Sequence, residues 1–198
     1  GWTRIVPAVC AMVAAELAWT QNFPVKPIRI VTSAAGGNSD FASRLIAQGL
    51  SPALGQQVIV DNRGGGILPI EVVAKAPADG YTLLYNGSTL WLLPLMQDVS
   101  YDFMRDFVPV SMTLNAPTII IVHPSLPVKS VKDLIALAKA RPGVLNYGSA
   151  SAGTSNHLAA ELLESMTGID IVRIPHKGTG PGIISLMANQ VQMMMPAE

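Results

Sequence analysis

The feature that most constrains the fold is a unit that recurs along the chain, a short strand-like run followed by a loop of small residues and then a helical apolar pattern. Ile28–Val31 is such a run, and residues 32–40 and a helix follow it. Residues 144–147 repeat this order, with a loop over 147–157. Such units build parallel α/β sheets, in which the loops after the strands gather at one edge, where ligands bind. We therefore expect an α/β fold.

The loops themselves have the chemistry of anion sites. Small and hydroxylic residues follow the predicted strands at 32–40, 86–89, 147–157 and 175–181. Backbone N–H groups at a helix start carry partial positive charge and bind carboxylates and phosphates. Taken alone, each loop is more typical of an ordinary helix start than of a binding site, with Thr154 or Ser155 as a cap. Their repetition favours a binding function.

Composition excludes several other classes of function. The 198 residues carry 13 basic and 13 acidic side chains and no basic run, so we expect no nucleic-acid partner. No glycine-rich nucleotide motif is present, and the three histidines lie too far apart in sequence to indicate a metal site. We expect no cofactor.

The N-terminal segment differs from the rest of the chain. Arg4 precedes an apolar run over residues 5–15, and small and polar residues follow it. This order predicts a secretory signal peptide over 1–22, and a structural N-terminal helix is the alternative. Cys10, the single cysteine, lies inside this segment, so the mature protein would have neither disulfide nor thiol chemistry. We therefore expect export to the periplasm.

The remainder divides into two predicted lobes. Residues 23–117 form the first lobe, and residues 118–198 form a second, incomplete one. Extended segments at 108–112 and 118–122 are expected on either side of the crossing between them. The last predicted strand, 191–195, is an internal parallel strand that needs neighbours on both sides. We therefore expect the sequence to be truncated at its C-terminus.

A hydrolase is the main alternative from another class. Ser149 or Ser155 could serve as a nucleophile with His157 as its base. However, no G-x-S-x-G elbow is present, and residues two apart on a helix point away from each other. We do not expect an enzyme.

Several motifs, in a fixed order, resemble those of the tripartite tricarboxylate transporter solute-binding receptors, the Bug-type extracytoplasmic proteins. The resemblance covers most of the chain and rests on these stretches: Pro24-x-Lys26-Pro27-Ile28-Arg29, Gly36-Gly37-x-x-Asp40, Gly55-Gln56-x-Val58-x-Val60-x-Asn62-Arg63, Val73-Ala74-Lys75-x-Pro77-x-Asp79-Gly80-Tyr81-Thr82-Leu83, Lys129-Ser130-Val131-Lys132-Asp133-Leu134-Ile135, Gly153-Thr154-Ser155-x-His157-Leu158-Ala159 and Pro175-x-Lys177-Gly178.

The resemblance implies a periplasmic binding protein of type II-like architecture, with two Rossmann-like α/β lobes that close over a small organic carboxylate. It implies membrane transporter subunits as partners, or alternatively a membrane sensor protein, and a monomer when full-length. The loops 33–40 and 149–157 would face each other across the cleft. The candidate ligand-binding residues are Ser33, Ala34, Ala35, Gly36, Gly37, Asn38, Asp40, Ser149, Gly153, Thr154, Ser155 and His157, with Ser88, Lys177 and Gly178 as weaker candidates.

Overall fold

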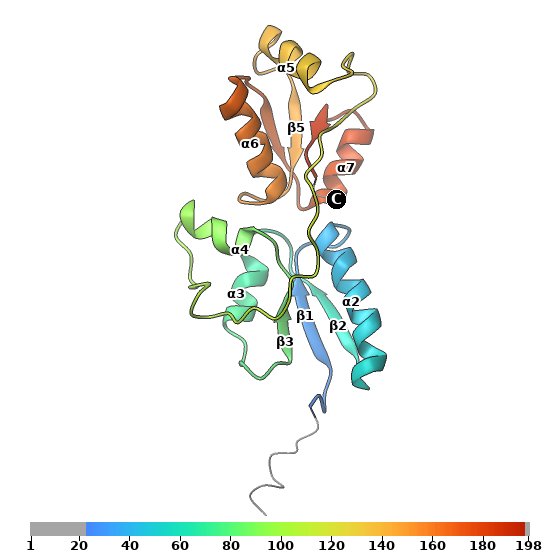
Figure 1. Ribbon diagram of the computed structural model, residues 1–198, viewed down its shortest axis with the longest axis vertical. Helices are drawn as coiled ribbons and strands as arrows, with labels where there is room; N and C mark the ends of the chain where they lie inside the picture. The colour runs from blue at the N-terminus through green and yellow to red at the C-terminus, as the bar shows by residue number, and fades with distance from the viewer. Residues whose placement is uncertain (1–22, 197–198) are drawn as a thin grey trace, which may run out of the picture.

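The computed structural model describes residues 23–196. The predicted signal peptide, residues 1–22, lies outside the described residues. Two α/β lobes stack along the long axis of the molecule, each around its own sheet (Figure 1). We call the lobe with β1, β2 and β3 the first lobe and the lobe with β4, β5, β6 and β7 the second lobe.

The first lobe contains a parallel sheet with β1 at its centre, in the order β2-β1-β3. Helices follow each of the three strands, as the repeated unit predicts. Their bounds are β1 Ile28–Thr32, α2 Asn38–Leu54, β2 Val58–Asn62, α3 Leu68–Ala74, β3 Thr82–Leu84, α4 Thr89–Leu92 and the 3₁₀ helix η2 Leu93–Leu95.

The second lobe has a four-stranded sheet in the order β4-β7-β5-β6. Strand β5 runs parallel to β6 and β7, whereas β4 runs antiparallel to β7. The bounds are β4 Ile121–Val122, α5 Val131–Ala140, β5 Asn146–Ser149, α6 Ser155–Thr167, β6 Val172–Pro175, α7 Thr179–Met187 and β7 Met193–Met194.

Local sequence signals explain where several helices begin and end. Ser130 Oγ accepts the Asp133 N–H at 3.1 Å, as expected from the capping-box pattern Ser130-x-x-Asp133 at the start of α5. Gly55 and Gly168 adopt left-handed conformations, with φ of 62° and 67°, and end α2 and α6. Glycine reaches this region without steric penalty, so each residue lets the chain turn back toward its sheet.

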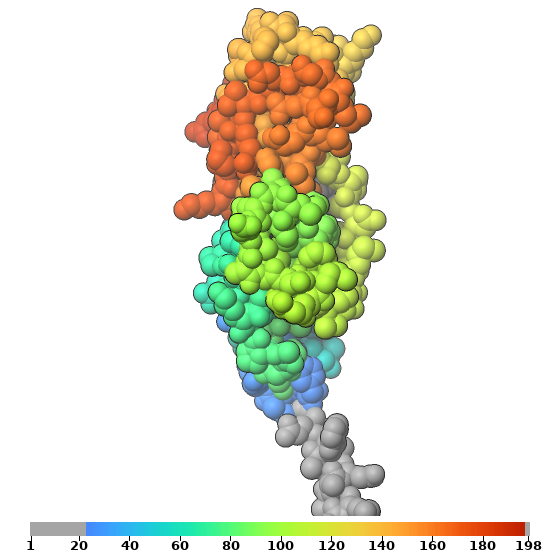
Figure 2. Space-filling view, turned by 90° about the vertical axis from the view of Figure 1, so that its left-hand side faces the viewer, coloured from blue at the N-terminus to red at the C-terminus, as the bar shows by residue number. Residues whose placement is uncertain are grey.

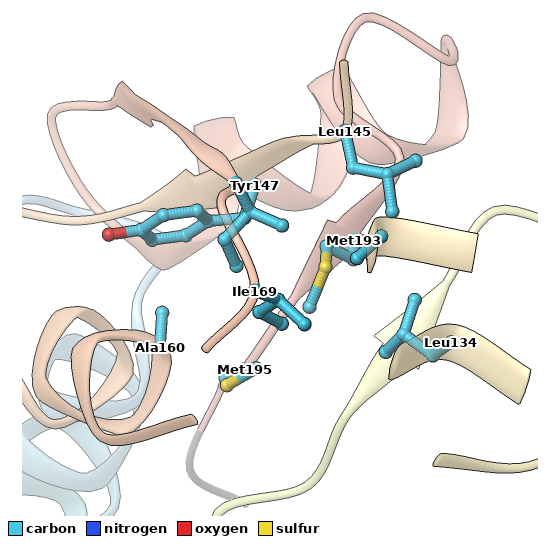
Figure 3. Close-up of a cluster of buried hydrophobic side chains, with 9 residues drawn as sticks. Leu134, Leu145, Tyr147, Ala160, Ile169, Met193 and Met195 are labelled. Carbon is cyan, nitrogen blue, oxygen red and sulfur yellow. The ribbon is translucent and has the colours of Figure 1, made fainter. Parts of the chain in front are cut away.

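Apolar side chains from strands and helices fill the core of the second lobe (Figure 3). Tyr147 and Met193 are fully buried, and Leu134 of α5 packs in the same cluster. Met194 and Met195 are also buried, so the methionine run belongs to the core, as the sequence predicts. Burying such side chains stabilises the lobe by about 1.5–3 kcal/mol each.

The segment between the lobes contains little regular structure. Residues 108–112 form no strand, and Val108 and Val110 are more than four-fifths exposed. Their apolar alternation is typical of a strand, but no strand among the described residues pairs with this segment, which runs as an irregular connection between the lobes (Figure 1). In the predicted extended segment 118–122, Ile121–Val122 pairs with β7, Thr118 forms an isolated bridge, and the Ile119 N–H donates to the Pro196 carbonyl at 3.0 Å. The lobe boundary at residues 117 and 118 stays a prediction.

Candidate functional site

A cavity of about 130 Å³ lies between the lobes, and both lobes contribute to its wall. The lining residues belong to five loops, each of which follows a parallel strand (β1, β2, β3, β5 or β6), as expected for the carboxyl edges of α/β sheets. They are Ser33, Ala34, Gly37, Asn38, Ser39, Gly65, Gly66, Asn86, Gly87, Ser88, Thr89, Ala150, Ser151, Thr154, Ser155, Asn156, Lys177, Gly178 and Thr179.

The lobes touch around this cavity. A Cβ atom on Gly180 would lie 2.5 Å from the Gly36 carbonyl oxygen. The backbone at the start of α7 therefore packs directly against the backbone of the loop after β1. A Cβ atom on Gly153 would lie 3.4 Å from the Leu93 side chain. Figure 2 shows the same closeness, with the orange part of the second lobe resting on the green part of the first. The two lobes are therefore in contact beside the cavity that both of them line.

Helix α6 begins at the cavity with free backbone donors. Thr154 occupies its N-cap position, but the Thr154 hydroxyl donates to the Ser151 carbonyl at 2.7 Å and does not cap the helix. Thr154 is therefore the cap residue, as an ordinary helix start predicts, but the capping hydrogen bond is absent. Within residues 23–196, the N–H groups of Ser155, Asn156 and His157 have no acceptor. Unsatisfied amides at a helix start attract an anion.

Helix α2 brings a second positive end to the cavity from the first lobe. Its N-cap, Gly37, is extended and has no side chain that could cap the helix. Among the lining residues none is acidic, and Lys177 is the single charged side chain. Two helix starts and one ammonium group therefore favour an anion in the cavity, and the acidic residue in the first turn of α2, Asp40, is paired with Arg44.

Asp40 is a predicted ligand-binding residue that does not line the cavity. It is 6% exposed, and its carboxylate accepts the Gly36 N–H at 2.9 Å and the Asn62 amide at 3.0 Å. Arg44 pairs with it at 2.9 Å. Burial raises the pKa of Asp40, but the bonds from Gly36, Arg44 and Asn62 hold that pKa below its usual value of 3.8. Asp40 therefore stabilises the loop after β1 through hydrogen bonds on the side away from the cavity.

Two predicted residues of the second lobe, Ser149 and His157, likewise have side chains bonded away from the cavity. Ser149 is fully buried, with its hydroxyl donating to the Ala150 carbonyl and accepting from Arg173 Nε at 2.7 Å. His157 Nδ1 accepts the Gly153 N–H at 3.3 Å, and His157 Nε2 lies 3.4 Å from Glu161. Both ring nitrogens are thus engaged with groups other than a serine hydroxyl.

The structure brings most of the predicted residues together and separates the rest. Ser33, Ala34, Gly37, Asn38, Ser88, Thr154, Ser155, Lys177 and Gly178 line the cavity. Ala35, Gly36, Asp40, Ser149, Gly153 and His157 do not, because they face solvent or the interior of their own loops. That any of these residues contacts a ligand stays a prediction.

Several lining residues were not predicted. Gly65 and Gly66 belong to a triple glycine that the sequence presents as a flexible turn, and a Cβ atom on Gly65 would lie 2.3 Å from Ser151 Oγ. Glycines after a strand are a signal for close backbone approach, so the run itself could have indicated this contact. Ser151, Asn156 and Thr179 lie in predicted loops but required the structure to show which way they face.

Comparisons with known proteins agree with this geometry. The family model described as "Tripartite tricarboxylate transporter family receptor" matches residues 42–197. The protein BugT of Bordetella pertussis is 39% identical over 176 residues, which are 86% of this chain and 54% of that protein. The chain therefore spans about half the length of this relative.

Solved structures show the same family likeness. An R. palustris protein with adipate superimposes with a TM-score of 0.81 at 35% identity, over 88% of this chain and 60% of that one. The periplasmic binding protein BugD superimposes with a TM-score of 0.84 at 29% identity, with the same coverage of both chains. These neighbours are two-lobed periplasmic binding proteins. The chain belongs to the tripartite tricarboxylate transporter receptor family.

Proposed function

We propose that this protein is an extracytoplasmic solute-binding receptor that captures a small carboxylate-bearing solute between its lobes for a tripartite tricarboxylate-type transporter. The observation that carries this proposal is the inter-lobe cavity, which has unpaired amides at the start of α6 and no acidic side chain. Membership of a receptor family and the adipate in one related structure support it.

The cavity favours a ligand with an acidic group at each end. Helices α2 and α6 belong to different lobes, and both begin at the cavity wall. A dicarboxylate could place one carboxylate at each helix start and so hold the two lobes together. Because its two ends contact different lobes, such a ligand would stabilise the closed arrangement, which the membrane subunits would then recognise.

The proposed location is the periplasm. Related receptors are periplasmic proteins, such as BugD, and the signal peptide over residues 1–22 stays a prediction. Among residues 23–196, the structure contains no helix with the length and apolar composition needed to cross a bilayer.

A thermal-shift panel tests the proposal. Mono-, di- and tricarboxylates are compared with adipamide, which has the length of adipate but no charge. We expect at least one dicarboxylate at millimolar concentration to raise the unfolding midpoint, because a ligand that binds only the folded state stabilises it. We expect adipamide to leave the midpoint unchanged. The proposal of a carboxylate receptor would be contradicted if adipamide stabilised the protein as much as adipate did. It would also be contradicted if none of the anions raised the unfolding midpoint.

A further inference from the structure

His157 supports the cavity wall from behind. It lies in the first turn of α6, is 8% exposed and does not line the cavity. Its Nδ1 atom accepts the N–H of Gly153, which is buried with a φ of +75°. Gly153 immediately precedes Thr154 and Ser155, which line the cavity. The imidazole is thus hydrogen-bonded to the turn that precedes α6, and this turn sets the direction of the unpaired N–H groups at the start of that helix.

This hydrogen bond specifies one charge state and one tautomer of the ring. A nitrogen that accepts an N–H carries no proton, so the proton of the neutral ring is on Nε2. Nε2 lies 3.4 Å from Glu161 Oε1, which also accepts the Tyr147 hydroxyl at 3.1 Å. Glu161 therefore favours the tautomer that leaves Nδ1 free to accept from Gly153.

We propose that His157 is a positioning residue whose neutral Nδ1 holds the Gly153 turn in its binding shape, and whose protonation releases that turn. The structural half of this proposal stands on the hydrogen bond itself. The expected loss of ligand affinity in acid rests on the proposed function.

The charges around His157 determine where the transition falls. Glu161 faces it from its own helix and Arg173 from β6, and the Tyr147 hydroxyl of β5 donates to the Glu161 oxygen that His157 Nε2 approaches. Arg173 is fixed on the loop after β5 by its bonds to Ser149 Oγ and the Ala150 carbonyl. Burial and Arg173 lower the pKa of His157, and Glu161 opposes them, so the pKa lies below 6.5. The neutral ring predominates at neutral pH.

A ligand-free NMR titration tests the structural half. In the full chain, histidine ¹⁵N shifts and the Gly153 amide shift are followed from neutral to acidic pH. We expect His157 to be in its Nε2–H form at neutral pH, with the Gly153 amide shifting at the pH where His157 protonates. A protonated Nδ1 at neutral pH, or a Gly153 amide that does not respond when His157 titrates, would overturn the proposal.

Two substitutions test the functional half, with adipate as the probe. His157→Asn keeps an acceptor close to the position of Nδ1, whereas His157→Leu removes it. At neutral pH we expect H157L to bind about tenfold more weakly and H157N to stay within about threefold of the wild type, as for loss of one hydrogen bond. Circular dichroism verifies that both variants are folded.

The pH profile distinguishes positioning from a general structural role. Adipate is fully ionised at pH 6.5 and above, so titrations between pH 5 and 6.5 are corrected with the measured ionisation of adipate itself. We expect wild-type affinity to fall with His157 protonation and H157N affinity to lack that fall. Equal profiles for the two proteins would overturn the proposal. Failure of the wild type to bind any carboxylate would refute the proposed function, while the NMR titration still decides the role of His157.

Discussion

The proposed anion site can be tested by removing one backbone N–H donor at the start of α6 while the helix itself stays folded. Ser155 is the first residue of α6, lines the cavity, and has an N–H with no acceptor within residues 23–196. Proline lacks this N–H but suits the first helical position. Thr154 has φ −76° and ψ 155°, the extended conformation that a residue before proline adopts. Ser155→Pro should therefore fold normally.

The expected effect follows from the single lost bond. A hydrogen bond from an amide to a carboxylate contributes about 1.5–3 kcal/mol, so S155P should weaken binding of the preferred carboxylate roughly 10- to 100-fold. Ser155→Ala keeps the N–H and should bind within about threefold of the wild type. Isothermal titration calorimetry measures all of the affinities.

A matched control isolates the position of the proline. Val131 is the first residue of α5, away from the cavity, and follows Ser130 in an extended conformation with φ −148° and ψ 162°. Val131→Pro makes the same chemical change at a helix start outside the proposed site, so its affinity should equal that of the wild type. Wild-type affinity in S155P, or equal losses in S155P and V131P, would refute the assignment of the Ser155 amide to ligand binding.

Four other substitutions probe the surroundings of the cavity. In urea unfolding at pH 7, Asp40→Ala should lower the free energy of unfolding by about 2–3 kcal/mol, and Arg44→Ala should lower it by less than about 1 kcal/mol. Because the pKa of Asp40 is lowered in the folded protein, the stability difference between the wild type and Asp40→Ala should disappear as the pH falls through that pKa. Tyr147→Phe should cost about 1 kcal/mol through its lost bond to Glu161, and an equal stability would show that bond to be unimportant. Lys177→Met should weaken carboxylate binding no more than about fivefold, because Lys177 is exposed. A larger loss of affinity in calorimetry would show that the Lys177 side chain, and not the backbone amides, is the main ligand of the anion.

The sequence predicted the elements whose signals are local. The apolar run at Ile28–Val31 forms β1, and the Ser130 and Asp133 pair caps α5 as expected. The segment 108–112 has the same alternation as a strand but remains unpaired among the described residues, because strand formation depends on a neighbour that local sequence does not specify. The periodicity of apolar residues therefore located the strands and helices that pack in the cores. It could not show which extended segments find a neighbouring strand to pair with.

The candidate site shows the same division between loops and side chains. The loops that line the cavity follow the strands that the sequence indicated, since the carboxyl ends of parallel strands share an edge. The direction of individual side chains was not predictable. Asp40 and His157 resemble ligand-binding groups by type, yet each bonds a glycine N–H within its own loop. Their orientation is set by burial and by Arg44 and Glu161, each one helical turn further along, and these contacts form only in the folded protein.

The most direct test of the central claim is a crystal structure of the full-length protein with the dicarboxylate that stabilises it most. The account predicts that the ligand lies between the lobes, with one carboxylate oxygen about 2.7–2.9 Å from the Ser155 nitrogen and the other carboxylate at the start of α2. A ligand bound elsewhere, or one in this cavity whose carboxylates contact neither helix start, would contradict it.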